Sequence, residues 1–260
     1  MIIDCHTHVN TDSDSNNTTE HLAAAEKVDA CIVLAQPANS EQDPNKALSN
    51  YVKTHQNKTL GFAVVNPIND GVTPRVLTAA TEKLGLKGIV LYCARSAFHP
   101  CHSLAMQLYQ VAQKAGLPVF FHNGNPLHAD AVLDFAQPYL LDEVARAFPD
   151  LKIIIGNMGE PFCEQTLAVV AKHENVYADL TIRPNELWHV YNAVIMAHER
   201  DVMDKLLFGS GFPDAVSGEC IEALLGFNRL LGDTNLPTVP RGSIRDVIER
   251  DALSLLGIER

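Results

Sequence analysis

The sequence lacks an apolar run long enough to cross a bilayer. No uninterrupted stretch approaches the roughly 18 residues that a transmembrane helix needs, which argues against a membrane-spanning helix. The first residues, Met1-Ile2-Ile3-Asp4, also lack the basic segment and longer apolar stretch of a secretion signal. We therefore expect a cytoplasmic protein that does not bind membranes.

The sequence is also poor in basic residues, and its cysteines form no recognisable pair motif. The chain carries 31 acidic against 20 basic residues, a formal net charge of −11. Such a chain repels a phosphate backbone, which argues against nucleic acid as a partner. Its six cysteines are scattered, with no Cys-x-x-Cys pair. We expect reduced, mostly buried thiols rather than a disulfide framework.

What the sequence does contain is a regular alternation of short β-branched runs and helical stretches. At 260 residues, 47% of them hydrophobic, the chain is large enough for a substantial core. The predicted strands are Ile2–Ile3, Ala30–Leu34, Leu60–Val65, Lys87–Leu91, Leu117–Phe121, Leu151–Ile155, Asn175–Leu180 and Lys205–Phe208. Continuous apolar runs of this kind are typical of parallel strands that are buried on both faces.

Apolar residues spaced three and four apart predict helices between these runs, at Val72–Leu84, Leu104–Ala115, Ala131–Phe148 and Glu164–His173. Eight strand–helix units of about 30 residues fill the chain. We therefore predict an α/β fold, a single (β/α)8 barrel domain over residues 1–260, with a doubly wound sheet as the alternative. Ile244–Leu256 is expected to form a final amphipathic helix outside the barrel.

Two histidines follow the first predicted strand directly, in Asp4-Cys5-His6-Thr7-His8. Side chains two apart on an extended segment point to the same side, so both imidazoles can reach one ion. A third histidine, His122, ends the fifth predicted strand. In a barrel these side chains meet at the carboxyl-terminal mouth, where barrel enzymes keep their chemistry. We interpret them as metal ligands.

The opening Ile3-Asp4-Cys5-His6-Thr7-His8 resembles the amidohydrolase-related family, in the branch with aminocarboxymuconate-semialdehyde decarboxylase-like and lactonase-like barrels. Further stretches are similar to that family in order and spacing: Gly61–Pro67, Gly116–His122, Phe148–Gly156, Leu207–Ser210 and Ala252–Gly257. The resemblance covers nearly the whole chain. It implies a metal-dependent barrel that acts on a small carboxylated or cyclic substrate, by hydrolysis or, as the second choice, by decarboxylation.

The resemblance also implies which residues hold the metal. In the family the His-x-His pair and the strand-five histidine bind a divalent ion, commonly zinc, which assigns His6, His8 and His122. Two further family residues are replaced here. Asn157 stands where the family has a histidine after strand six, and Gly211 where it has an aspartate after strand eight. Asparagine can still hydrogen-bond a substrate, but it exchanges no proton near neutral pH, and glycine supplies neither a ligand nor a base.

Three neutral histidines are still a legitimate zinc set with an open fourth position. The loss of a positioned base, however, costs a factor of roughly 10²–10⁴ in rate. Candidate replacement carboxylates are Asp214 and Glu160 in mouth loops and Asp179 at the end of strand seven. For each of them the simpler interpretation is a solvated loop or capping carboxylate. Asp4 is interpreted as a structural group that orients one of the histidines.

Side chains in the mouth loops are candidates for substrate binding. Arg95 after strand four and Arg183 after strand seven suit a carboxylate through bidentate hydrogen bonds, although each is equally explained as a surface charge. His128 after strand five is a candidate to replace the missing strand-six histidine. His99 and His102, in the loop after strand four, are further candidates for substrate binding. The histidines in predicted helices or at their ends are expected on the surface: His21, His55, His173, His189 and His198.

Two other hypotheses stay open. A chain that has lost the family's aspartate and histidine is also explained as a non-catalytic barrel that binds a small ligand or a protein partner. A metal-free barrel that uses Cys5 or Cys93 as a nucleophile is the third hypothesis, and buried thiols are the commoner explanation. The sequence fixes neither the substrate nor the oligomeric state, although a homodimer is the commonest soluble assembly.

Overall fold

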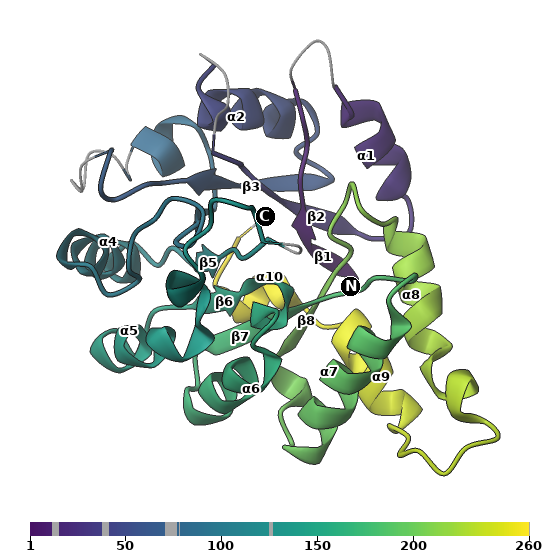
Figure 1. The fold of residues 1–260 in the computed structure, drawn as a ribbon. Coiled ribbons are helices and arrows are strands. Elements are labelled where there is room, and N and C mark those ends of the chain that lie inside the picture. Colours follow the sequence, from purple (N-terminus) through teal and green to yellow (C-terminus); the bar gives the residue numbers. More distant parts are fainter. Residues whose placement is uncertain (12–15, 38–41, 71–76, 78, 125–126, 260) are drawn as a thin grey trace.

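The strands form one parallel sheet in sequence order. The structure is a computed structural model that describes residues 1–11, 16–37, 42–70, 77, 79–124 and 127–259. Its strands are β1 (Ile3–Thr7), β2 (Ala30–Leu34), β3 (Thr59–Val64), β4 (Gly88–Leu91), β5 (Val119–Phe121), β6 (Ile153–Ile155), β7 (Val176–Thr181) and β8 (Leu206–Gly209). The sheet closes just beyond β8, where the N–H of Gly211 donates to the carbonyl of His6 at 2.9 Å. The chain is therefore the predicted (β/α)8 barrel, with a ring of helices around the strands (Figure 1).

Most helices lie between consecutive strands on the outside of the sheet, and the last three follow β8 (Figure 1). They are α1 (Thr18–Ala24), α2 (Pro44–Thr54), α4 (Ser103–Lys114), α5 (Leu141–Ala147), α6 (Cys163–Lys172), α7 (Leu187–Glu199), α8 (Ser217–Leu225), α9 (Arg241–Ile248) and α10 (Ala252–Leu255). Short 3₁₀ turns cover Leu133–Ala136, Pro138–Leu140, Gly156–Gly159, Met203–Lys205 and Phe227–Leu231. In the described part of the chain, no helix combines the length and the apolar character needed to cross a bilayer.

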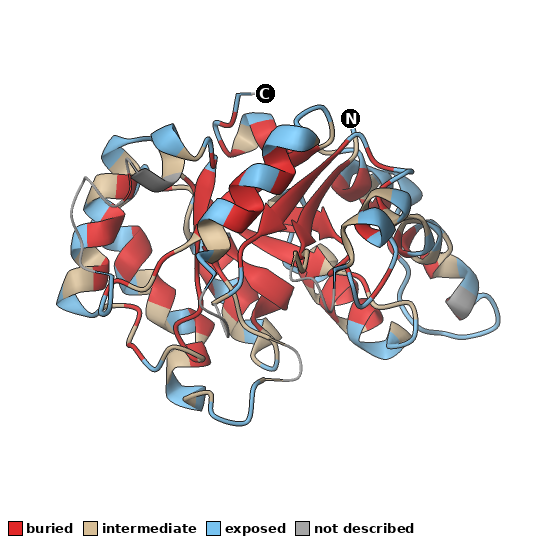
Figure 2. Ribbon diagram, turned by 90° about the horizontal axis from the view of Figure 1, so that it is seen from above, coloured by how far each residue is buried: buried red, intermediate tan, exposed pale blue. Residues whose placement is uncertain are grey.

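The apolar strands are buried on both faces, as their composition predicts. Figure 2 shows strands that are buried along their length and helices that bury one side. Phe62, Phe120, Ile154 and Leu207 fill the barrel interior, and a second, larger apolar cluster lies between the strands and the helices. A strand that must pack inward and outward at once needs apolar residues at successive positions, which explains the continuous runs.

One predicted helix is interrupted in the structure, and another is described only in part. The segment predicted as one helix over Ala131–Phe148 is two short 3₁₀ turns followed by α5, because Pro138 has no N–H to donate within a helix. Residues 72–76 and 78 of the predicted helix Val72–Leu84 lie outside the described residues, and a π-helix over Ala79–Lys83 is described near its end.

The C-terminal segment also differs from the single outer helix that was predicted over Ile244–Leu256. It forms α9 and α10, and Asp251 begins α10 by accepting a hydrogen bond from the N–H of Ser254 at 3.2 Å. Ala252 and Leu253 belong to the same apolar cluster as the barrel interior. The last helix therefore packs against the inside of the barrel, not against the outer ring.

Candidate metal centre

His6, His8 and His122 meet at the carboxyl-terminal end of the barrel. His6 lies in β1 and His8 follows it, while His122 directly follows β5 and donates its backbone N–H to the carbonyl of Leu91 at 2.8 Å. The Nε2 atoms of the three rings form a triangle in which every side measures 3.1 Å. Among the described residues, no other group of histidine, cysteine or carboxylate side chains lies close enough together to hold one ion.

The size of this triangle suits a divalent ion. With metal–nitrogen distances of about 2.0–2.1 Å, tetrahedral ligand atoms lie about 3.3–3.4 Å apart, and neighbouring octahedral ones about 2.9 Å apart. The observed 3.1 Å separations fall between these values. The imidazoles therefore fit one face of a coordination sphere and leave its opposite face for water or substrate.

Hydrogen bonds on the far side of two rings fix which nitrogen carries the proton. His6 donates from Nδ1 to Oδ2 of Asp179 at 2.5 Å, and His8 donates from Nδ1 to the carbonyl of Leu34 at 3.0 Å. Both rings therefore present an unprotonated Nε2 to the triangle. One proton on His122 can satisfy only one of these facing lone pairs, so the arrangement calls for a positive ion at its centre. Such outer hydrogen bonds are typical of metal-binding histidines.

Burial keeps the rings in the form that binds metal. Desolvation, followed by the neighbouring His6, lowers the pKa of His8 to about 3. Desolvation also lowers the pKa of His122 well below its ordinary value. Only an imidazole without the second proton can ligate an ion, so no proton has to be removed from these two rings at neutral pH.

Asp179 in β7 is the carboxylate that contacts this centre. Besides His6, its Oδ2 accepts hydrogen bonds from the hydroxyl of Thr181 at 2.7 Å and from the N–H of Asn157 at 3.1 Å. Its side chain is fully buried. The interpretation of Asp179 as a solvated loop carboxylate is wrong, because β7 continues to Thr181 and keeps the residue inside the barrel end.

Asp4 holds the backbone of β1 rather than an imidazole ring. Its Oδ1 accepts the N–H of His6 at 3.2 Å and the N–H of Ser210 at 2.9 Å, so it joins β1 to the end of β8. Burial raises the pKa of Asp4 to about 6. The residue thus positions the main chain of His6.

The two replaced family positions send no side chain to the triangle. The side-chain amide of Asn157 donates to the carbonyl of Asn123. Gly211 has a φ of +69°, and a Cβ added there would lie 2.7 Å from Cγ2 of Thr181. Thr181 therefore occupies the space into which a side chain at position 211 would begin.

The carboxylates Glu160 and Asp214 also lie apart from the three histidines. Glu160 pairs with Arg183 at 3.1 Å and with His189 at 3.4 Å, and Arg183 pairs in addition with Glu186 at 3.0 Å. Asp214 is exposed in the turn after β8. The structure places neither carboxylate in the histidine group, and it engages Arg183 with two carboxylates.

Of the remaining candidates, Arg95 lies near the centre and His128 does not. Arg95 is half-buried in the loop after β4, and its positive charge helps to lower the pKa of His122, after burial and the two other histidines. His128 is exposed, with its Nδ1 3.5 Å from Asp130.

His21 is buried, contrary to its predicted place on the surface. Its Nδ1 lies 2.7 Å from the hydroxyl of Tyr51 and its Nε2 lies 3.0 Å from Oγ1 of Thr7. Thr7 donates its own hydroxyl proton to the carbonyl of Ile32 at 3.0 Å, so His21 donates to Thr7. Because Thr7 separates His6 from His8, His21 supports the main chain between these two histidines. A single histidine on a short helix gives no sequence signal for this contact.

The cysteine hypothesis finds no support in the structure. Cys5 and Cys93 are buried, and burial raises the pKa of each thiol well above its ordinary value. A protonated thiol is a poor nucleophile. All six cysteines are free, as the sequence predicts.

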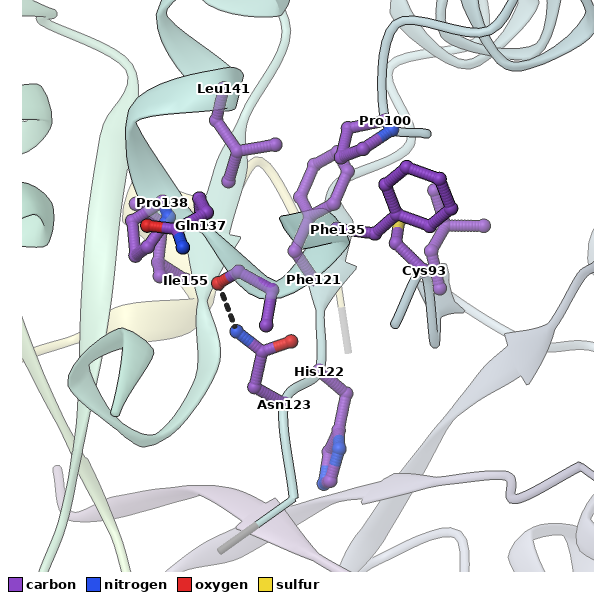
Figure 3. Close-up of a pocket in the computed structure, with 12 residues that line it drawn as sticks. Cys93, Pro100, Phe121, His122, Asn123, Phe135, Gln137, Pro138, Leu141 and Ile155 are labelled. Carbon is purple, nitrogen blue, oxygen red and sulfur yellow. Dashed lines mark hydrogen bonds between the residues drawn. The ribbon is translucent and has the colours of Figure 1, made fainter. Parts of the chain in front are cut away.

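A small hollow adjoins the candidate centre, and a larger one among the neighbouring loops is lined by none of the three histidines. The smaller one, beside His122, is lined by Cys93, Phe121 and Asn123, whose side-chain amide donates to the carbonyl of Ala136 at 2.8 Å (Figure 3). Its volume of about 10 Å³ leaves room for a single water molecule. The larger one, about 470 Å³, lies between the loops after β5 and β6 and α7. That volume is within the usual range for small-molecule sites.

Comparisons with known proteins agree with this architecture. Residues 3–237 match the model of a protein family described as amidohydrolase. No curated protein matches the chain by sequence. Among solved structures, the chain is similar to a probable 2-pyrone-4,6-dicarboxylic acid hydrolase from Acinetobacter baumannii with citric acid bound, with a TM-score of 0.70 and 14% identity over 99% of each chain.

Two decarboxylase structures are similar to the same extent. A 5-carboxyvanillate decarboxylase from Sphingomonas paucimobilis gives a TM-score of 0.72 at 11% identity over 99% of each chain. Its counterpart from Novosphingobium aromaticivorans, solved with manganese bound, gives 0.69 at 12% identity over 99% of this chain and 97% of the other. At such low identities the likeness to solved structures establishes the barrel fold and no more.

Proposed function

Because the chain belongs to the amidohydrolase family, we propose that it is a metal-dependent hydrolase of a small carboxylated or cyclic substrate. The observation that carries this proposal is the 3.1 Å triangle of Nε2 atoms, in which two fixed tautomers aim lone pairs at one point. His6, His8 and His122 would hold one divalent ion. We propose zinc, since nitrogen ligands suit it, and manganese is the second ion to test.

The proposed substrate carries a carboxylate. Three neutral imidazoles leave the double positive charge of the ion uncompensated within the ligand set, which favours an anion at the open positions. Arg95 near His122 adds a second positive group, and a guanidinium can bind a carboxylate through two parallel hydrogen bonds. The names of the similar hydrolase and decarboxylases also refer to carboxylated compounds.

The groups around the centre favour hydrolysis over decarboxylation. A divalent ion bound here would polarise a substrate carbonyl and make water a nucleophile near neutral pH. Decarboxylation needs, in addition, a side chain that delivers a proton to the carbon that loses the carboxylate. Among the described carboxylates, Asp179 contacts the centre, and its Oδ2 is already bound to His6. Without a positioned base we expect hydrolysis about 10²–10⁴-fold slower than with one.

A non-catalytic barrel that binds a carboxylated ligand is the alternative. The observation that favours it is at position 211, where the left-handed backbone and Thr181 leave no place for the carboxylate expected from the family pattern. Both functions use the same metal and the same arginine, so ligand binding alone does not distinguish the enzyme from the non-catalytic barrel. Turnover of a substrate distinguishes them.

Ring opening of cyclic esters is the test. Protein loaded with zinc or manganese is offered small lactones with and without a carboxylate, and opening is followed by absorbance. We expect slow opening that His8→Ala abolishes, and a raised KM for the carboxylated lactone alone in Arg95→Gln. Metal-loaded protein that binds the carboxylated lactone and opens no ester would support the non-catalytic alternative.

A further inference from the structure

The candidate centre has its buried carboxylate on strand seven instead of strand eight. Oδ2 of Asp179 receives three hydrogen bonds, from His6 Nδ1 at 2.5 Å, Thr181 Oγ1 at 2.7 Å and Asn157 N at 3.1 Å. Three donors that converge on one oxygen leave no place for a proton on it. Its other oxygen, Oδ1, is buried without a hydrogen-bond partner among the described residues. The hydrogen bonds to Oδ2 therefore hold the Asp179 side chain beside the imidazole of His6.

The neighbouring strand is shaped around this carboxylate. A Cβ added to Gly209 in β8 would lie 2.1 Å from Oδ1 of Asp179 and 2.9 Å from Cβ of His6. Only glycine leaves that space open. At Gly211 the added Cβ would meet the methyl group of Thr181, the residue whose hydroxyl holds Asp179. Positions 209 and 211 thus lack side chains where the pair Asp179 and Thr181 needs room.

We propose that Asp179 is the positioning residue of the metal centre, acting through the Nδ1–H of His6, with Thr181 and the main chain of Asn157 holding it in place. The proposal rests on the metal site of the proposed function. A carboxylate on the far nitrogen fixes the ring orientation and makes Nε2 a stronger donor to a cation. It also places one negative charge one imidazole away from an ion whose direct ligands are neutral.

Substitutions at Asp179 separate its charge from its shape. Asp179→Asn can keep the oxygen that receives the three hydrogen bonds and removes the charge, while Asp179→Ala removes both. Zinc affinity is measured by competition with a chromogenic chelator. We expect affinity about 10–100-fold weaker in both variants, with the larger loss in Asp179→Ala. The matched control is Asp142→Asn. The carboxylate of Asp142 contacts Lys172 and His173 near the end of α6, so this variant should bind zinc as the wild type does. Zinc binding by Asp179→Asn within twofold of wild type would overturn the proposal.

A spectroscopic signal distinguishes this role from a merely structural one, and it does not depend on turnover. The Nδ1–H of His6, in a 2.5 Å hydrogen bond, should give a strongly downfield proton resonance in protein with labelled histidine. It should move upfield in Asp179→Asn, while the Nδ1–H signal of His8 stays. If wild type takes up no ion, the proposed function fails, and this resonance alone decides the inference. A wild-type His6 signal at an ordinary position would refute it.

Discussion

Replacing Gly211 with aspartate tests whether the strand-eight carboxylate can simply be restored. At a φ of +69°, a side chain other than glycine costs about 1–2 kcal/mol, with aspartate near the lower end. The added Cβ would also lie 2.7 Å from Cγ2 of Thr181, an overlap of the kind that costs about 1–3 kcal/mol. We therefore expect Gly211→Asp to lower the free energy of unfolding by about 2–4 kcal/mol. That is a large part of the 5–15 kcal/mol or so that is typical of a folded protein.

A second substitution isolates the clash. Thr181→Ser removes the methyl group and keeps the hydroxyl that donates to Asp179. In the double variant Gly211→Asp/Thr181→Ser only the backbone strain remains, so about 1–3 kcal/mol should be regained. Thr181→Ser alone is the control for the loss of the methyl group.

Thermal unfolding followed by circular dichroism measures these differences. For a chain of this size, 1 kcal/mol corresponds to about 2–4 °C in Tm, so Gly211→Asp should melt roughly 4–16 °C below wild type. The double variant should melt closer to wild type. A single variant as stable as wild type, or a double variant no more stable than the single one, would show that Thr181 does not occupy the place of a strand-eight side chain.

Three further predictions concern the rest of the barrel. His21→Ala should lower the free energy of unfolding, measured in urea, by about 3 kcal/mol, because it removes two buried hydrogen bonds and leaves a void. The control is His128→Ala at an exposed position, which should change the free energy of unfolding by less than about 0.5 kcal/mol. Hydrogen bonds from the end of α6 lower the pKa of Asp142 from 3.8 to about 2. The carboxylate therefore stabilises the fold above its unfolded pKa, so Asp142→Asn should cost about 1 kcal/mol at pH 6, and the difference should shrink as the pH falls from about 4 to 2. In native protein a thiol reagent should label only Cys101 and Cys163, and should label them slowly, because burial raises the pKa of both thiols to about 11. Rapid labelling of all six thiols would contradict the burial of the other four.

The fold was predictable because parallel strands and barrel helices leave periodic patterns. Apolar runs marked all eight strands to within a few residues, since each strand of a barrel is buried on both faces. The segment after β5 was predicted wrongly although Pro138 carried a signal against a continuous helix. The course of the C-terminal tail was not predictable in the same way. Whether an amphipathic turn packs inside or outside a barrel depends on the shape of the remaining opening, which no local pattern records.

The site was predictable where it follows strand geometry and unpredictable where it depends on contacts across the barrel. The spacing of His6 and His8 and the place of His122 at a strand end were enough to expect that they lie together. Glu160 was grouped with these histidines because it follows a strand end in the same way. The position in a mouth loop places its main chain but does not determine its side-chain partner, which is Arg183. Asp179 carried a usable signal, a carboxylate inside an apolar run, but its partner His6 is 173 positions away.

The metal content of purified protein shows whether His6, His8 and His122 hold an ion. Wild type and His6→Ala are purified without chelator or added metal, and zinc, manganese and iron are counted per chain by elemental analysis. We expect close to one divalent ion per wild-type chain and none in the variant. Wild-type protein that contains no metal and takes up none on addition would contradict this expectation.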